Sequence, residues 1–187
     1  MRIRLFKLSE LTGIGIAGFS AIMLRGVYEL SGRSLAAAVF LSANFSVWEQ
    51  LKPLLLCYFL YGGLELFGLK PYFRRFTASK AIGLLVLSAS YITLSLLTHG
   101  CFDNGANVFI SLFLSFGASR LMTLGSFDVS KLFYPACFLI FLIFMMFFCF
   151  TVCPPELPIF RDPSSGLFGI IPEHIDSGAI ILNSVYY

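Results

Sequence analysis

Five long apolar segments constrain the fold of this chain more than any other feature. They cover approximately residues 10–30, 47–68, 79–98, 106–125 and 132–152. Each is long enough to cross about 30 Å of hydrocarbon as an α-helix. Pro71, Gly100 and Pro154 follow the second, third and fifth segments, at points where a helix is expected to end. The pattern predicts an all-α integral membrane bundle of five transmembrane helices.

The composition leads to the same prediction. The 187 residues are 58% hydrophobic and 12% charged, whereas about 25% of the residues in soluble domains are charged. A soluble protein of this length has too much surface to bury so many apolar side chains. We therefore expect the lipid bilayer as a partner, the cell membrane as the location, and no nucleic-acid partner, because the basic residues lie in short clusters between apolar runs.

Lysine and arginine are unequally distributed between the two sets of loops. If five helices alternate in direction, nine basic residues fall on the side of the N-terminus: Arg2, Arg4, Lys7, Lys70, Arg74, Arg75, Lys80, Arg120 and Lys131. The other side holds Arg33 and Arg161. The positive-inside rule then predicts that the N-terminus is in the cytoplasm and the C-terminus outside.

Two segments do not fit the pattern of spanning helices. Residues 31–46 are partly apolar but too short to span, which indicates an interfacial or re-entrant turn. Residues 154–187 contain repeated prolines and a Pro-Ser-Ser-Gly turn, which favours an ordered loop over a helix. We therefore expect a bundle domain at 1–153 and an ordered, proline-rich extracytoplasmic tail at 154–187 that packs on it.

The best candidate site lies where the second span begins. Glu49 and Lys52 are ionisable groups at the edge of a lipid-facing segment, where burial at the bilayer centre costs about 2.5–3.5 kcal/mol each. Arg25 and Glu29 end the first span near the same outer surface, so these four charges are expected in one layer. Two simpler interpretations remain open: Glu49 caps its helix together with Ser46, and Arg25 pairs with Glu29 one turn away.

The predicted outer binding cluster contains ten residues: Arg25, Tyr28, Glu29, Asn44, Ser46, Trp48, Glu49, Lys52, Arg161 and Asp162. Trp48 is the sole tryptophan, and its position at a membrane boundary is typical of an interfacial anchor. Glu65 lies at the inner end of the second span, where we expect a structural pairing with Lys70, Arg74 or Arg75. Gly13, Ala17 and Ala21 form a small-residue stripe that favours close helix packing.

The sequence shows no recognisable catalytic or metal-binding motif. His99 and His174 have no second ligand at a suitable spacing, and most of the five cysteines are expected to fill helix interfaces. We therefore expect no catalytic residues, no metal and no cofactor. A Cys101–Cys153 disulfide would require an oxidising exterior and Cα atoms within about 7 Å.

Three patches of the sequence are similar to a known family pattern. Residues 28–32 (Tyr-Glu-Leu-Ser-Gly), 44–52 (Asn-Phe-Ser-Val-Trp-Glu-Gln-Leu-Lys) and 160–170 (Phe-Arg-Asp-Pro, then Gly166 and Gly169-Ile170) resemble an uncharacterised family of small bacterial multi-pass membrane proteins, the domain of unknown function 6512. The resemblance implies a membrane bundle and no known activity. Where the family has histidine, glutamate and histidine, this chain has Arg25, Phe45 and Gln50, so a shared metal-dependent activity is not expected.

Three functions are consistent with these features. The first is a small binding or transport bundle whose charged pocket near the outer face holds a small polar solute or a lipid headgroup. The second is a membrane enzyme with Glu49 as general base and Lys52 or Arg25 stabilising negative charge. The third is a structural or assembly protein in which the charges hold helices together. Such a protein would form a homo-oligomer or bind a membrane partner.

The topology can be tested by thiol labelling. In a variant whose five native cysteines are replaced by serine, a cysteine placed at Ser164 should react with an impermeant thiol reagent added outside intact cells. Labelling from the cytoplasmic side only would contradict the predicted orientation.

Overall fold

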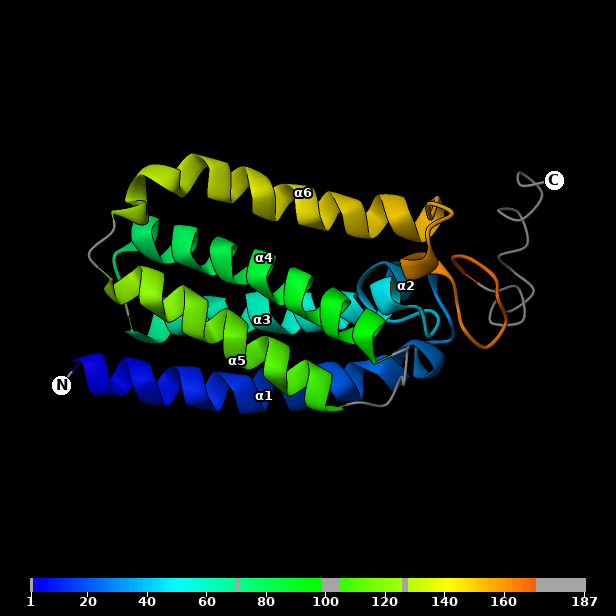
Figure 1. Cartoon of the computed structure of the whole chain (residues 1–187), viewed down its shortest axis with the longest axis horizontal. Coiled ribbons are helices and arrows are strands. Elements are labelled where there is room, and N and C mark those ends of the chain that lie inside the picture. Colours follow the sequence, from blue (N-terminus) through cyan, green and yellow to red (C-terminus); the bar gives the residue numbers. More distant parts are fainter. Residues whose placement is uncertain (1, 70, 99–104, 126–127, 171–187) are drawn as a thin grey trace.

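The computed structural model of the chain is an all-helical bundle (Figure 1). It describes residues 2–69, 71–98, 105–125 and 128–170. Within these ranges there is no β-strand, and the long helices are α1 (Arg2–Leu30), α3 (Val47–Leu69), α4 (Phe73–Leu97), α5 (Gly105–Leu124) and α6 (Phe133–Val152). The short elements are α2 (Leu35–Phe40) and the 3₁₀ turns η1 (Val129–Leu132) and η2 (Pro158–Phe160).

Among the described residues, five helical segments are long and apolar enough to cross a membrane, which confirms the predicted fold class. They are Leu8–Leu30, Val47–Leu69, Phe73–Leu97, Gly105–Leu124 and Val129–Val152. Many large apolar side chains on these helices are exposed, among them Leu64, Phe67 and Phe138. Exposure on this scale is unusual for a soluble monomer, so the architecture is that of a multi-pass membrane protein.

The third span begins earlier than the sequence indicated. α4 starts at Phe73, whereas the apolar pattern placed its start near residue 79. Arg74 and Arg75 were assigned to a loop because of their charge, but no proline or glycine follows them to stop a helix, and long basic side chains can extend to a membrane boundary from a helix end. Lys80 therefore lies inside the bundle rather than in a loop.

α4 occupies the centre of the bundle and packs against α3, α5 and α6, while α1 packs against α3 and α5 (Figure 1). The small-residue stripe of α1 makes this close approach feasible. Ala17 and Ala21 are buried, and a Cβ atom on Gly13 would clash with the rings of Tyr61 and Phe116. These contacts place α1 directly beside the polar side chains of α3 and α5.

The two ends of the bundle differ in structure. We call the end that carries α2 and the described part of the tail the tail end; α1 begins at the opposite, N-terminal end (Figure 1). The backbone reverses after α1 at Gly32 and Arg33, which both have positive φ, and α2 is capped by the Ser34 hydroxyl, which accepts from Ala37 N at 3.3 Å. α2 spans only about 9 Å at 1.5 Å per residue, so this segment covers the tail end and does not cross the bundle.

The described part of the tail is a loop, as the sequence indicated. Residues 154–170 form a loop that contains η2 and an isolated β-bridge between Arg161 and Phe168.

Cys57 is buried as expected, whereas Cys137, Cys149 and Cys153 are exposed and do not fill helix interfaces. Cys101, His99 and His174 lie outside the described residues, as do residues 171–187 of the predicted tail.

Candidate functional site

Glu49 and Lys52 form a buried ion pair in the first turns of α3. Lys52 Nζ lies 2.8 Å from Glu49 Oε2, and neither side chain is appreciably exposed. The same ammonium group donates to Ala38 O at 2.6 Å and to Thr151 Oγ1 at 2.9 Å. An ammonium group has three N–H donors, and here three protein acceptors surround it. The pair therefore links α2, α3 and α6.

Glu49 does more than cap its own helix. Ser46 Oγ accepts from Glu49 N at 3.3 Å, as in a capping box. The Glu49 carboxylate, however, accepts from Ala43 N at 2.9 Å and binds Lys52 instead of returning to Ser46. Its charge thus fixes the loop before α3 as well as the helix itself.

The tail is attached to the same loop by polar contacts. Asn44 Nδ2 donates to Gly169 O at 2.7 Å, and Asn44 Oδ1 accepts from Ser46 N at 2.8 Å. Phe45 N donates to Asp162 Oδ1 at 3.1 Å. Residues far apart in the sequence are therefore joined at the tail end, with Asp162 at the centre of the tail turn.

Asp162 is held as a buried carboxylate. Burial by itself raises the pKa of Asp162, but hydrogen bonds from Ser164, Ser165 and the Phe45 backbone outweigh this effect, and the pKa lies below its ordinary value. Ser165 donates to Oδ2 through both its backbone N (2.8 Å) and its hydroxyl (2.7 Å). Since the folded pKa is depressed, this turn contributes stability at neutral pH that is lost as the pH falls through the folded pKa.

Trp48 is a packing residue, which differs from the interfacial anchor that the sequence suggested. Its side chain is buried, and its ring centroid lies 6.1 Å from that of Phe147 and 5.3 Å from those of Phe150 and Phe160. Phe160 belongs to η2 of the tail. The indole therefore connects the tail to α6, because the tail covers the end of α3 from which Trp48 projects.

Among the described residues, the four charges predicted to share one layer do not form a single network of ion pairs. Arg25 donates to Tyr91 OH at 3.1 Å, and Tyr91 OH donates to Gln50 Oε1 at 3.2 Å. Glu29 is exposed, and in the described ranges it forms no ion pair with Arg25 or Lys52. The expected pairing of Arg25 with Glu29 is also absent there, because Arg25 points toward α4 and Glu29 points away from the bundle.

The remaining two predicted residues lie at the edges of the cluster. Tyr28 is buried and its hydroxyl donates to Arg33 O at 3.4 Å. Arg161 is exposed, and its Nε donates to Gly166 O within the tail turn at 3.1 Å. The structure thus brings together Asn44, Ser46, Trp48, Glu49, Lys52 and Asp162, with Arg25 connected to them through Tyr91 and Gln50.

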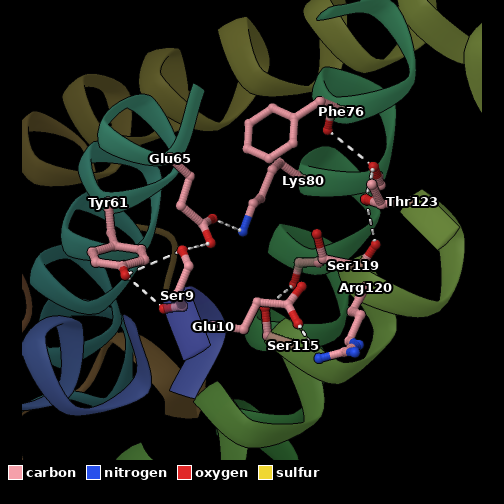
Figure 2. Close-up of polar contacts among 12 residues, drawn as sticks. Ser9, Glu10, Tyr61, Glu65, Phe76, Lys80, Ser115, Ser119, Arg120 and Thr123 are labelled. Carbon is pink, nitrogen blue, oxygen red and sulfur yellow. Dashed lines mark hydrogen bonds and ion pairs between the residues drawn. The ribbon is translucent and has the colours of Figure 1, made fainter. Parts of the chain in front are cut away.

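A second buried network lies toward the N-terminal end, and the sequence analysis did not anticipate it (Figure 2). Glu65 Oε2 of α3 lies 2.5 Å from Lys80 Nζ of α4. Glu10 Oε2 of α1 lies 3.2 Å from Arg120 of α5. Four helices therefore each contribute one charge, and the four charges balance. Among the described residues, Glu65 pairs with Lys80 and not with the expected Arg74 or Arg75, because α4 already begins at Phe73 and presents Lys80 to α3 two turns later. Lys70, the third expected partner, lies outside the described residues.

Hydroxyl groups connect α1 and α3 within this network. Ser9 Oγ donates to Glu65 Oε1 at 2.6 Å, and Tyr61 OH donates to Ser9 O at 2.6 Å. Thr12 Oγ1 lies 2.9 Å from the Tyr61 hydroxyl. Figure 2 shows Ser9, Tyr61, Glu65 and Lys80 gathered between the helices. The carboxylate of Glu65 therefore has both a cation and a hydroxyl donor.

Aromatic rings surround the ammonium group of Lys80. It lies 4.5 Å from the Phe116 ring centroid and 5.2 Å from that of Tyr58, distances that favour a cation–π interaction. On α5, the hydroxyl groups of Ser111 and Ser119 are buried without a hydrogen-bond partner among the described residues. Figure 2 draws Ser119 beside this network, so its hydroxyl is a polar group there that no described residue satisfies.

A signal for this network exists in the sequence. Ser111, Ser115 and Ser119 recur every four residues on α5, which places them on one helix face, and Ser115 Oγ donates to Gly83 O of α4 at 2.7 Å. Glu10 was given no role although it begins the predicted first span at 10–30, and Lys80 and Arg120 were used only as topology markers. Among the described residues, no group of three or more His, Cys, Asp or Glu is arranged to hold a metal ion.

The Glu49–Lys52 pair can be tested by removing its charges. Glu49→Gln or Lys52→Met leaves one buried charge unpaired and should lower the unfolding free energy by about 3–5 kcal/mol. The double variant Glu49→Gln/Lys52→Met should regain most of that loss. Thermal unfolding of the purified protein in detergent measures both effects, with Asp128→Asn at the exposed start of η1 as the control. A Glu49→Gln variant as stable as the wild type would contradict the burial of this pair.

Comparison with known proteins identifies a family. No curated protein and no solved structure matches the chain. A family model described as a family of unknown function (DUF6512) matches residues 6–170, which includes all five spans and the described part of the tail. The sequence patches at residues 28–32, 44–52 and 160–170 had indicated this same family, and the match confirms it. The chain belongs to the family of unknown function DUF6512.

Proposed function

We propose that this membrane protein is a small binding or transport bundle and that its site is the network of Glu10, Glu65, Lys80 and Arg120. The observation that carries the proposal is a set of two buried carboxylates, one buried lysine and the half-buried Arg120, one from each of four spanning helices. Ionisable residues inside membrane spans are costly and mark functional sites by default.

Stability does not account for this network. Replacing a buried ion pair by apolar residues of similar size is often neutral or stabilising, so a bundle that needs only packing has no use for four charges. The two pairs also join different helices, α3 with α4 and α1 with α5. A small relative movement of these helices would separate the partners and expose both signs of charge to a ligand.

The chemistry of the site suits a small zwitterion. An ammonium group of the ligand would take the place of Lys80 or Arg120 beside a carboxylate, and an anionic group would take the place of a carboxylate beside a cation. The unpartnered Ser119 hydroxyl is available as a further hydrogen-bonding group. Such an exchange keeps every buried charge paired, as a low-dielectric site requires.

The Glu49–Lys52 pair supports a structural role better than a catalytic one. Lys52 is surrounded by three acceptors from three parts of the chain, and Glu49 is held by Ala43 N. A general base needs access to a substrate proton. We therefore place Glu49 and Lys52 among the residues that hold α2 and the tail in place.

A second candidate site at the tail end rests on Arg25. Its Nε atom is buried and has no hydrogen-bond partner among the described residues, although its Nη2 binds Tyr91 OH. An anionic group of a small polar solute or a lipid headgroup beside Tyr91 and Gln50 would satisfy this donor. This candidate retains the predicted outer cluster, with Arg25 rather than Glu49 as the group that contacts the ligand.

A ligand-stabilisation assay tests the first proposal. Purified wild-type protein is heated with α-amino acids and betaines, and, as controls, with their amide or ester analogues, which keep the ammonium charge and lack the carboxylate. A ligand at 100 times its Kd should add about 2.7 kcal/mol of stability, seen as a rise in Tm. Glu10→Gln should abolish that rise, and Glu29→Gln, an exposed glutamate on the same helix, should preserve it. A panel in which no zwitterion raises the Tm of the wild type would contradict the proposal.

A further inference from the structure

An apolar cavity of about 300 Å³ lies between α3, α4 and α6, beside the charged network. Its walls include Phe59, Gly63, Leu66, Phe73, Phe76 and Ile140. Lys80 contributes to one wall, with its ammonium group directed to Glu65. The cavity is therefore an apolar site that the proposed function does not use.

The cavity is elongated along the helices. On α4 its lining runs from Phe73 to Leu84, which corresponds to about 16 Å at 1.5 Å per residue. This is roughly half of the 30 Å hydrocarbon core, the depth of one leaflet. The lining starts at the first residue of α4, so the cavity begins at a span boundary and extends toward the centre of the membrane.

One side of the cavity is open to the surroundings of the bundle. Phe59, Phe73 and Cys137 line it and are themselves exposed. A Cβ atom added to Gly63 would meet no atom within 4 Å, so this glycine leaves the groove unfilled. Because these helices are membrane spans, the opening faces acyl chains rather than water.

Positive charge lies at the boundary end of the cavity. Arg74 is exposed and lies 5.8 Å from the Phe133 ring centroid, and the Phe133 ring is 5.5 Å from Phe73, a cavity residue. In the described ranges Arg74 forms no ion pair. Arg75 and Lys131 add to the positive charge, and Asp128 is the acidic residue near them. The excess favours an anionic group at this end.

We propose that this groove binds one acyl chain of an anionic phospholipid, with the lipid phosphate at Arg74. The apolar walls match the chain, the length of the groove matches one leaflet, and the exposed guanidinium group matches the phosphate. The inference is independent of the proposed solute site, because Lys80 is already paired with Glu65 and is not needed to hold the phosphate.

Native mass spectrometry of the detergent-purified full chain tests the proposal, with phosphatidylglycerol and phosphatidylcholine of identical acyl chains as probes. The wild type should retain phosphatidylglycerol with a roughly fivefold preference, the effect of one basic residue at an anionic surface. Gly63→Phe should fill the groove and abolish the retention of both lipids. Gly68→Phe, also on α3 and also with no atom within 4 Å of its added Cβ, is the matched control and should bind as the wild type does.

The headgroup contact is tested separately with a substitution of the exposed Arg74. Arg74→Gln should remove the preference for phosphatidylglycerol and leave phosphatidylcholine retention unchanged. The proposal is overturned if Gly63→Phe retains lipid as the wild type does, if Gly68→Phe loses it equally, or if Arg74→Gln keeps the full preference. Glu10→Gln should retain the lipid, so loss of solute binding and loss of lipid binding are distinguishable.

Discussion

The structure depends on one constraint: within the spans, each buried charge must find its partner inside the protein. A bilayer offers no water to solvate an isolated ion or an unpaired backbone group. The bundle meets this requirement at two levels along its axis. At the tail end, Lys52 is surrounded by Glu49, Ala38 and Thr151; toward the N-terminal end, Glu65 pairs with Lys80 and Glu10 with Arg120.

These two levels satisfy the constraint in different ways. The Glu49–Lys52 pair lies within a single helix at i, i+3, so helix movements do not break it, and its remaining contacts fasten α2 and α6 to it. The other pairs cross between helices, so they depend on how the helices sit relative to one another. This difference is why we assign the first pair to structure and the second network to a ligand.

The sequence could predict the features that depend on helix length and hydropathy. Five apolar runs predicted the five spans, and the prolines after residue 153 indicated the loop that residues 154–170 form. Hydropathy gives no information on the rotation of each helix about its axis, so it could not show that Lys80 faces Glu65 or that Glu29 points outward. Because Arg74 and Arg75 are charged, the first turns of α4 were not recognised as helix, and Lys80 was assigned to a loop.

The predicted outer cluster was partly correct for the same reason, because hydropathy locates the ends of the spans. Glu49, Lys52, Asn44 and Asp162 lie close together because their positions at span and tail boundaries place them at one end of the bundle. Trp48 was expected to be an interfacial anchor, but the tail covers the span boundary where Trp48 lies. The sequence could not show this contact, because it joins distant parts of the chain. The network of Glu10 and Arg120 joins residues 110 positions apart, and no local spacing in the sequence indicates such a pair.

A double-mutant cycle between Glu65 and Lys80 tests the central claim most directly. The unfolding free energies of the wild type, Glu65→Gln, Lys80→Met and the double variant are compared in the same detergent. A direct buried pair across helices predicts a coupling energy of about 1–3 kcal/mol. Additive effects, within about 0.5 kcal/mol, would contradict the claim that interhelical charge pairing holds this network together.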